Sequence, residues 1–458
     1  MNARRYASDI VAFAEFAAGL RLLDVPPEVV ERARTIVLDC IGCIVAGQRA
    51  AEMDRLVDTK SADRTGVATV LGRSTTRSPE AAALLNGTAG TWLDLDEGNL
   101  HTKGHPGIQI LPAAFAAAEA ADRNGADLLL SVIVGYEVGC RIYGATAARL
   151  AVHPHGTFGP MAAALALCKQ QAAAPALIAQ TMAIAASLGI AASRGTLSDG
   201  ATVRNAYTGL SGHMAFLALD LAAAGFSGER NALASVFGQI YGETYDATWA
   251  LDGLGRDWLL LRNYFKLHPS GRYVHSAIDL LDQIQRDCGA SIDPDNIERI
   301  DIETYAMAAT MARQTVDTPF GTRFSIPFAV AEHLLGYDRD ITADGSAAFA
   351  SPQVQALAQR VWVTELAEFT RAYPRHQHSR MRVSLVNGQT LSAEADLIKG
   401  EPAHPHSRSE IEGKFLTLVG PSWRARSEEA LARLHQIDEI SSICHLAQQL
   451  RSMAGEAP

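Results

Sequence analysis

Along the first 260 or so residues, small and apolar side chains recur at the three- and four-residue spacing of buried or amphipathic helices. Segment 26–47 opens with prolines and closes with a glycine, as helices often do. Gly135 and Gly139, four residues apart, would let two helices approach closely, or are simply tolerated within one helix. Further helical patterns occupy segments 78–95, 111–123, 127–150 and 159–171.

Segment 170–193 carries no charged residue over 24 positions. It is mostly alanine, which favours lipid weakly, and it is interrupted by proline, glutamine and glycine. We therefore expect two packed core helices there and no membrane span. The N-terminal residues 1–20 mix an arginine pair with acidic residues, which predicts an amphipathic helix and not a signal peptide.

The pattern changes after about residue 266, where side chains begin to alternate as they do in half-buried strands. Segments 299–305 and 359–366 alternate in this way. Segment 381–395 predicts a hairpin, with Asn387-Gly388 as a two-residue turn. Helical patterns such as 324–336 separate the strands, which indicates an α+β unit with an antiparallel sheet.

From about residue 401 the pattern is helical again, in segments 407–419 and 427–437. We predict a mainly α fold: residues 1–265 form a large all-helical domain, 266–400 an inserted α+β lid, and 401–458 helices that return to the first domain. A cleft between two such domains is a common place for a ligand site.

Composition narrows the class of protein. The 458 residues are 48% hydrophobic and 20% charged, as in an ordinary soluble globular protein. The formal net charge of −10 argues against a general binder of nucleic acid or of anionic membranes. The six cysteines lack the spacing of a zinc or iron–sulfur site, so we expect buried thiols in a reducing cytoplasm.

One stretch concentrates chemistry: LDLDEGNLHTKGHPG, residues 93–107. A calcium loop that starts at Asp94 would need glycine at its sixth position and glutamate at its twelfth, where this chain has Asn99 and His105. His101 and His105 are four apart, but neighbouring glycine and proline oppose the helix that a zinc-protease motif requires. We therefore expect no metal site here.

The alternatives for this stretch are a solvated loop between helices and a catalytic loop. His105 directly precedes a core-like helical segment, so its side chain should face inward. We interpret the stretch as a catalytic loop to which Asp94 and His105 contribute. Asp96, Glu97 and Lys103 are expected to be loop or rim charges.

Three basic clusters lie elsewhere in this acidic chain, each next to a helix start. His153 and His155 precede a glycine turn, which suits an anion or is only a capping feature. Arg204 precedes an apolar helix and alone would be taken for a surface arginine. Lys266, His268, Arg272 and His275 surround Pro269-Ser270-Gly271 at the expected domain junction. Together they indicate a small polyanionic substrate.

These residues resemble the MmgE/PrpD family, which includes 2-methylcitrate dehydratase, cis-aconitate decarboxylase and iminodisuccinate epimerase. The similarity runs from about residue 8 to about 450. The resemblance implies a helical domain with an α+β lid, a homodimer, and catalysis without a metal or cofactor. It is carried by PPEVVERARTIVLDCIGCIVAG, LDLDEGN…GHPG…LPAAFAAAEA, GYEVGCRI, HPHGTFGPMAAALA, FKLHPSGRYVHSAID, RFSIPFAVAEHLLG and EIEGKF.

By motif, the resemblance assigns catalytic roles to Asp94, His105, His153 and Lys266. Three positions depart from the family pattern. Many members have threonine at Gly98 and lysine at Arg204, and a tyrosine of the lid is replaced by Phe328. Arginine keeps the charge and the carboxylate fork, whereas phenylalanine donates neither a proton nor a hydrogen bond. The departures put the best-known substrates of the family in doubt.

The implied chemistry is the formation of a carbanion next to a carboxylate. We expect His105 to transfer the proton and Asp94 to hold its ring. Substrate carboxylates would be clamped by Lys266, Arg204 and Arg272, and His153 or His275 would protonate the leaving hydroxyl.

The function predicted first is a cofactor-independent hydro-lyase of a citrate-like polycarboxylate. The alternatives are an epimerase or isomerase, a decarboxylase, and a non-catalytic carboxylate binder, which Gly98 and Phe328 would favour.

Overall fold

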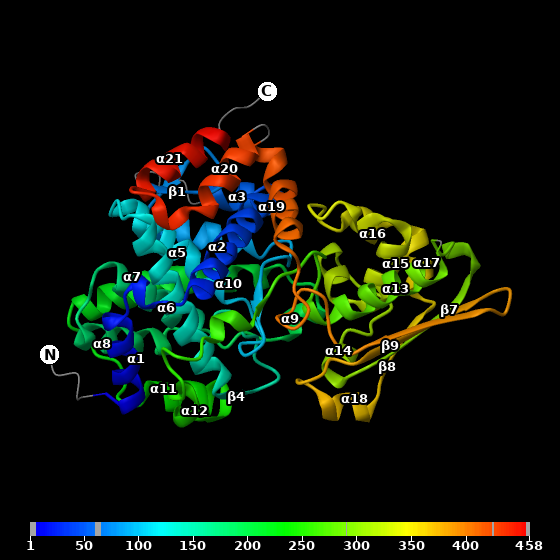
Figure 1. Cartoon of the computed structure of the whole chain (residues 1–458), viewed down its shortest axis with the longest axis horizontal. Coiled ribbons are helices and arrows are strands. Elements are labelled where there is room, and N and C mark those ends of the chain that lie inside the picture. Colours follow the sequence, from blue (N-terminus) through cyan, green and yellow to red (C-terminus); the bar gives the residue numbers. More distant parts are fainter. Residues whose placement is uncertain (1–5, 60–65, 290, 424–425, 455–458) are drawn as a thin grey trace.

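The computed structural model describes residues 6–59, 66–289, 291–423 and 426–454. It consists of a large helical unit and a smaller unit built on a sheet, which lie side by side (Figure 1). The chain passes from the first unit into the second and returns to the first with its C-terminal helices. The predicted mainly α fold with a smaller α+β lid is confirmed.

The helical unit holds the helices and short strand pairs of the N-terminal part. The strand pairs are antiparallel: β1 with β2, β3 with β6 and β4 with β5. The helices are α1 (Ser8–Gly19), α2 (Pro27–Gly47), α3 (Ala51–Thr59), α4 (Pro79–Gly90), α5 (Pro106–Ala120), α6 (Gly125–Gly144), α7 (Gly159–Gln170), α8 (Pro175–Ser187), α9 (Gly195–Ser198), α10 (Val203–Ala223), α11 (Ala232–Ser235) and α12 (Ala247–Leu251). The strands are β1 (Ala68–Thr69), β2 (Thr76–Arg77), β3 (Gly98–Asn99), β4 (Thr146–Ala148), β5 (Gly242–Tyr245) and β6 (Asn263–Tyr264).

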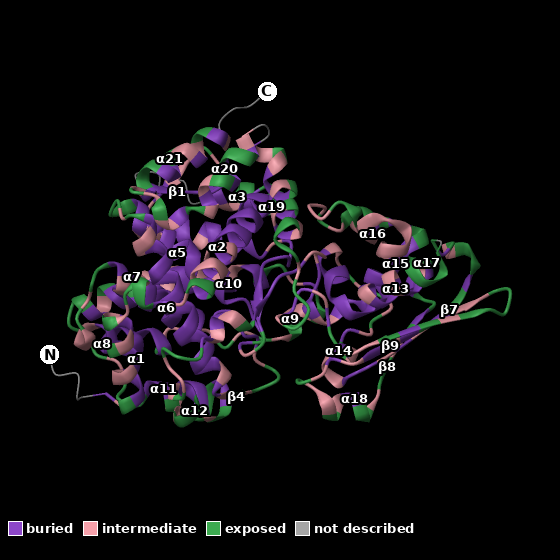
Figure 2. Ribbon diagram, viewed as in Figure 1, coloured by how far each residue is buried: buried purple, intermediate pink, exposed green. Residues whose placement is uncertain are grey.

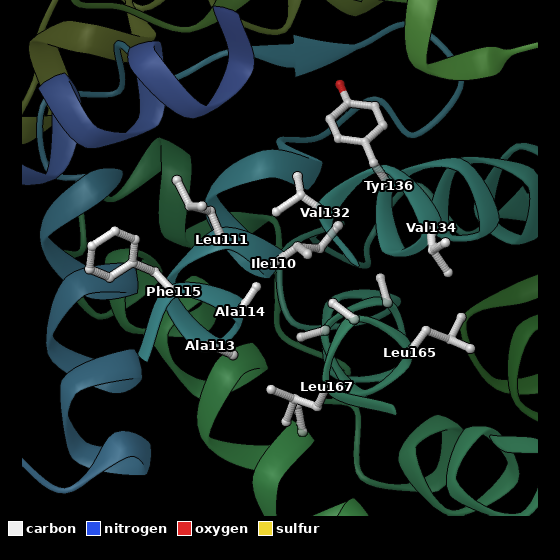
Figure 3. Packing of buried hydrophobic residues seen from close by; sticks show 14 of the residues in the cluster. Ile110, Leu111, Ala113, Ala114, Phe115, Val132, Val134, Tyr136, Leu165 and Leu167 are labelled. Carbon is white, nitrogen blue, oxygen red and sulfur yellow. The ribbon is translucent and has the colours of Figure 1, made fainter. Parts of the chain in front are cut away.

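The predicted close approach of two helices at Gly135 and Gly139 occurs between α6 and α7. A Cβ atom on Gly135 would lie 2.5 Å from the carbonyl oxygen of Ala162, and one on Gly139 would lie 3.0 Å from the Cβ of Ala162. Larger side chains would therefore push the two helices apart. Around this contact, apolar side chains of α5, α6 and α7 fill the centre of the unit (Figure 3).

The uncharged segment 170–193 was expected to hold two helices and contains one, α8, after the last residue of α7. Segment 188–194 is not regular helix. It returns beside His153, whose backbone nitrogen donates to Ala192 O at 2.8 Å. In the described part of the chain, every helix is too short or too polar to cross a membrane.

The lid is organised around a four-stranded sheet in the order β10-β9-β7-β8. Its strands are β7 (Ile297–Thr304), β8 (Val361–Glu365), β9 (Ser379–Leu385) and β10 (Thr390–Ala395). Its helices are α13 (His275–Cys288), α14 (Ala306–Ala309), α15 (Ile326–Leu335), α16 (Ser346–Ala350), α17 (Pro352–Ala358) and α18 (Ala367–Ala372).

Two details of the expected sheet differ in the structure. β7 pairs antiparallel with β9 but parallel with β8, because the connection between β7 and β8 carries the helices that a parallel crossover needs. The hairpin turn is also longer than predicted. Ser384 and Thr390 are the last paired residues and Leu385 N donates to Gln389 O, so segment 386–388 forms a three-residue turn, with Gly388 at φ +86°.

The C-terminal helices α19 (Arg408–Trp423), α20 (Ser427–His435) and α21 (Ile443–Ala454) lie against the N-terminal helices (Figure 1). Phe415 and Trp423 belong to the same hydrophobic cluster as residues of α2 and α5. A second cluster runs from Val274 to Ala393 within the lid. Figure 2 shows buried residues concentrated inside each unit. This separation supports our proposal that residues 266–400 form a domain inserted between 1–265 and 401–458.

Candidate active site

A pocket of about 100 Å³ lies between the helical unit and the lid. Its wall is rich in charged and aromatic side chains, which come from both units. It is lined by Asp94, Asn99, Leu100, Lys103, His105, His153, Pro154, His155, Arg194, Leu197, Arg204 and Tyr264 from the helical unit, and by Gly271, Arg272, Tyr273, Met311, Phe324, Tyr373, Pro374, Gln377 and Glu401 from the lid side.

His105 occupies the residue before α5, where Pro106 starts the helix. Its Nδ1 lies 2.6 Å from Oδ2 of the fully buried Asp96. Because a carboxylate accepts, this contact places the proton on Nδ1 and leaves the Nε2 lone pair available on the pocket side. Burial lowers the pKa of His105, although the charge of Asp96 opposes that shift. His105 is therefore neutral near pH 7 and can accept a proton.

The partner of His105 differs from the expected one. Sequence reasoning gave this place to Asp94 and treated Asp96 as a rim charge. Asp94 instead has a left-handed backbone, with φ +50°, so the two aspartates do not point the same way as alternate residues of a strand would. Asp96 holds the imidazole, and Asp94 points to the cations described next.

Asp94 is the centre of a buried ion cluster. Arg204 Nη2 lies 2.5 Å from its Oδ1, and Lys266 Nζ lies 3.4 Å from its Oδ2. The Lys266 ammonium also donates to the backbone oxygens of Asp94 (2.5 Å) and Ser270 (3.3 Å). Burial alone would raise the pKa of Asp94, but Arg204 and Lys266 outweigh it and hold that pKa below its ordinary value. Burial lowers the pKa of Lys266, against the opposing charge of Asp94. The cluster keeps Asp94 ionised.

Two further histidines continue from His105 along the pocket. The ring centroids of His105 and His155 are 4.7 Å apart, and those of His155 and His153 are 4.5 Å apart. The backbone nitrogen of His155 donates to His153 Nδ1 at 3.1 Å. Burial lowers the pKa of both His153 and His155 well below its usual value. The pocket wall thus carries a row of neutral imidazoles, of which sequence reasoning had selected His105 and His153.

The loop of residues 93–107 is anchored by buried hydrogen bonds and an ion pair. The expected rim charge Glu97 is fully buried, accepts from Gly107 N (2.7 Å) and from Tyr136 Oη (2.6 Å), and has a pKa that burial raises to about 8. Asp39 accepts from Glu97 N (2.9 Å) and from the Lys414 ammonium (2.5 Å). The same ammonium donates to the backbone of the loop, at Leu95 O (2.7 Å). Of the three expected rim charges, Lys103 is exposed at the rim.

The other predicted residues fall into two groups. Arg272 lines the pocket, with its guanidinium 4.7 Å from the centroid of the Tyr264 ring. Gly98 lies opposite Tyr264 in the β3–β6 pair, and a Cβ on Gly98 would lie 2.3 Å from Tyr264 Oη. Four expected site residues are not among those that line the pocket: Gly98, Lys266, His275 and Phe328. His275 is buried behind Arg272, with Nε2 3.3 Å from Ser270 O, and Phe328 is 2% exposed within the lid core.

Asp94, Asp96 and His105 lie close enough together to be examined as a metal site. Their contacts do not fit one. Asp94 is paired with Arg204 and Lys266, and Nδ1 of His105 is bonded to Asp96. Placing a cation among these groups would oppose two buried positive charges. The donor set therefore fits an ionic and hydrogen-bonded network better than a metal centre.

Several pocket residues were not selected from the sequence. Tyr264, Tyr273 and Tyr373 bring hydroxyl groups, and Glu401 brings a carboxylate that lies 3.4 Å from Arg272. Arg194 is the first charge after the long uncharged segment, which is the signal that could have drawn attention to it.

Comparisons with known proteins agree with this architecture. The family model described as the MmgE/PrpD N-terminal domain matches residues 11–249, and that of the MmgE/PrpD C-terminal domain matches residues 268–439. Among curated proteins, a cis-aconitate decarboxylase of Aspergillus terreus is 24% identical, over 95% of this chain and 94% of its own.

A cis-aconitate decarboxylase-like protein of Aspergillus oryzae is 28% identical, over 95% of both chains. The human cis-aconitate decarboxylase is 25% identical, over 88% of this chain and 86% of its own. The two family matches together cover most of the chain, in the order that the two units follow. The chain belongs to the MmgE/PrpD family.

Proposed function

We propose that the protein is a lyase whose reaction passes through a carbanion next to a carboxylate of a small polycarboxylate. One observation carries the proposal: a neutral His105, held through Nδ1 by Asp96, lines a pocket together with Arg204 and Asp94, and the buried Lys266 contacts Asp94. A base placed beside cations is what proton removal next to a carboxylate requires, because negative charge builds up on that carboxylate.

Each residue then has a role. His105 moves the proton at carbon, and Asp96 fixes its ring and tautomer. Lys266 and Arg204 bind the carboxylate that gains charge, and Asp94 orients both cations. His153, reached from His105 through His155, is the second proton carrier. Arg272, on the lid side of the pocket, binds another part of the substrate.

The geometry supports dehydration of a citrate-like hydroxy acid. His105 takes the proton from the carbon next to the carboxylate, and the carbanion expels the neighbouring hydroxyl. That hydroxyl leaves as water when His153 supplies a proton, so one carbon–oxygen bond breaks and one carbon–carbon double bond forms. The low pKa of His105 favours this reaction, because its resting state is a base.

Decarboxylation is the second candidate, and the relatives favour it, since those reported above are named cis-aconitate decarboxylases or likened to them. In that case a carboxylate leaves as carbon dioxide, the electron pair stays on carbon, and a protonated His105 supplies the proton. An epimerase would return the proton to the same carbon without any loss of water or carbon dioxide.

The test is NMR spectroscopy in D2O with cis-aconitate and with citrate and 2-methylcitrate, which are hydroxy acids, as separate substrates. Dehydration gives new alkene carbon signals, decarboxylation releases carbon dioxide, and epimerisation gives deuterium exchange without a new product. Dehydration or decarboxylation supports the proposal when His105→Ala and Lys266→Ala abolish it and the exposed-site variant Arg230→Gln does not, whereas epimerisation alone would contradict the assignment as a lyase. Tight binding without turnover or exchange would contradict it and indicate a carboxylate binder.

The remaining features are part of the same proposal. We propose that the enzyme works without a metal or cofactor, as a homodimer, in the cytoplasm, where its six free cysteines would stay reduced. Activity retained after treatment with EDTA, and a mass of two chains by light scattering, are the expected results.

A further inference from the structure

Arg194 is a pocket cation for which the described residues supply no carboxylate partner. It lies at the start of α9 and lines the active-site pocket. Its Nη1 contacts Met307 Sδ at 3.2 Å, and its Nε is buried without a hydrogen bond among the described residues. Backbone contacts fix the main chain at this position. Arg194 N donates to Ala151 O at 2.9 Å, and the preceding residue, Ser193, forms an isolated β-bridge with Val152. The main chain at Arg194 is therefore fixed, and the buried Nε of its guanidinium is left without a hydrogen bond among the described residues.

Lys103 lies near Arg194 at the rim of the same pocket. It is exposed and has a left-handed backbone, with φ +49°. The loop holds it there, because Lys103 N donates to Asn99 O and Asn99 N donates to Gly104 O, both at 3.0 Å. Burial lowers the pKa of the Lys103 ammonium, and the positive charge of Arg194 lowers it further. Within the described part of the chain, no carboxylate lies within 4.0 Å of either cation.

The other cations of the site have carboxylate partners within the protein. Arg204 and Lys266 share Asp94, and Arg272 pairs with Glu401. Two neighbouring positive charges without a counter-ion repel each other, and an anion between them would remove that repulsion and satisfy the free guanidinium donors. The free pair also lies on the side of the pocket lined by the helical unit, whereas Glu401 marks the lid side.

We propose that Arg194 and Lys103 form a second carboxylate-binding site at the rim of the pocket, which holds a substrate carboxylate remote from the reacting one. This inference rests on the proposed function and deepens it, because it requires a substrate with at least two carboxylates. The reacting carboxylate lies at Lys266 and Arg204, and the remote one fixes the register of the carbon chain against His105.

The experiment compares two ligands of equal chain length, glutarate and its monomethyl ester, by calorimetric titration. Arg194→Gln and Lys103→Gln should each weaken glutarate binding by about tenfold or more, since each removes a charge-assisted contact. Both should change ester binding by less than about threefold, because the ester leaves the rim site without an anion. Arg194→Lys should retain part of the glutarate affinity. Arg230→Gln, a change of an exposed arginine outside the pocket, should bind both ligands as the unaltered protein does.

Glutarate binding that is unchanged in both variants, or losses that are equal for glutarate and its ester, would overturn the rim site and leave the proposed function standing. If the unaltered protein binds neither glutarate, its ester, cis-aconitate nor citrate, then the pocket does not take carboxylates and both proposals fail. Circular dichroism melting curves that match the unaltered protein would show that both variants are folded.

Discussion

Nδ1 of His105 lies 2.6 Å from Oδ2 of Asp96, and both side chains are buried at the start of α5. The contact fixes which nitrogen of the imidazole carries the proton. It also fixes the direction in which the other nitrogen points. The chemistry that we propose depends on this pair more than on any other contact in the pocket.

Asp96→Asn should lower kcat/KM by about 10²-fold, in line with the usual cost of removing the group that orients a functional histidine. An amide would present a donor or a weaker acceptor to Nδ1 and favour the wrong tautomer. Steady-state kinetics and ¹⁵N NMR of the ring would report both effects. Asp58→Asn, at an exposed position of α3, is the matched control. Equal rates for the two variants would contradict the role of Asp96.

The Asp39–Lys414 pair should be important for stability because it holds the loop of residues 93–107 through Glu97 N and Leu95 O. Lys414→Met leaves a buried carboxylate unpaired, which costs about 3–5 kcal/mol. The same change at the half-exposed Lys399, which pairs with Glu410, should cost less than about 1 kcal/mol. Thermal unfolding midpoints measure the difference. A Lys414→Met midpoint as high as that of Lys399→Met would show that the pair is not needed.

Gly98 should resist substitution because of Tyr264. A methyl group at Gly98 would overlap the tyrosine hydroxyl, and forcing it in should cost about 1–3 kcal/mol. The double change Gly98→Ala, Tyr264→Ala removes the clash and should recover part of the unfolding midpoint that Gly98→Ala loses. If the double variant were no more stable than the sum of the single changes predicts, the clash would not be the cause.

Glu97 should make the protein less stable as pH rises. Burial raises its pKa to about 8 in the folded chain, from an ordinary value of 4.5. Between these values the folded state binds more protons than the unfolded state, so stability is full below about pH 4.5 and is lost as pH rises through about 8. In Glu97→Gln the unfolding midpoint should change less with pH over this window. In the exposed-site variant Glu15→Gln, the midpoint should vary with pH as it does in the unaltered protein. The same pH dependence in Glu97→Gln would contradict the assignment of the effect to Glu97.

Much of the fold follows from local sequence patterns. The proline-led helix α2, the α6–α7 contact at Gly135 and Gly139, and the strands of the hairpin depend on neighbours along the chain, and each lies where it was predicted. Features set by distant residues were harder to predict. The parallel pairing of β7 with β8 depends on how the intervening helices cross the sheet.

In the site, too, features set by neighbouring residues were predicted and features set by distant residues were not. His105 was found because a helix start follows it directly. The sequence could not show that Asp96, and not Asp94, holds His105. That arrangement depends on the left-handed backbone at Asp94 and on cations from α10 and the junction segment. His275 was chosen from the basic cluster at the domain junction and Phe328 by motif, but the packing of the lid keeps both off the pocket wall.

The central claim is that His105 moves a proton at a carbon next to a substrate carboxylate. The most direct measurement is deuterium incorporation from D2O into substrate or product, followed by NMR for the unaltered protein, His105→Gln and Arg230→Gln, with cis-aconitate and citrate. The account predicts incorporation by the unaltered protein and by Arg230→Gln, and a loss of at least about 10²-fold in His105→Gln, the low end expected for removing a general base. Incorporation by His105→Gln at the unaltered rate would contradict it.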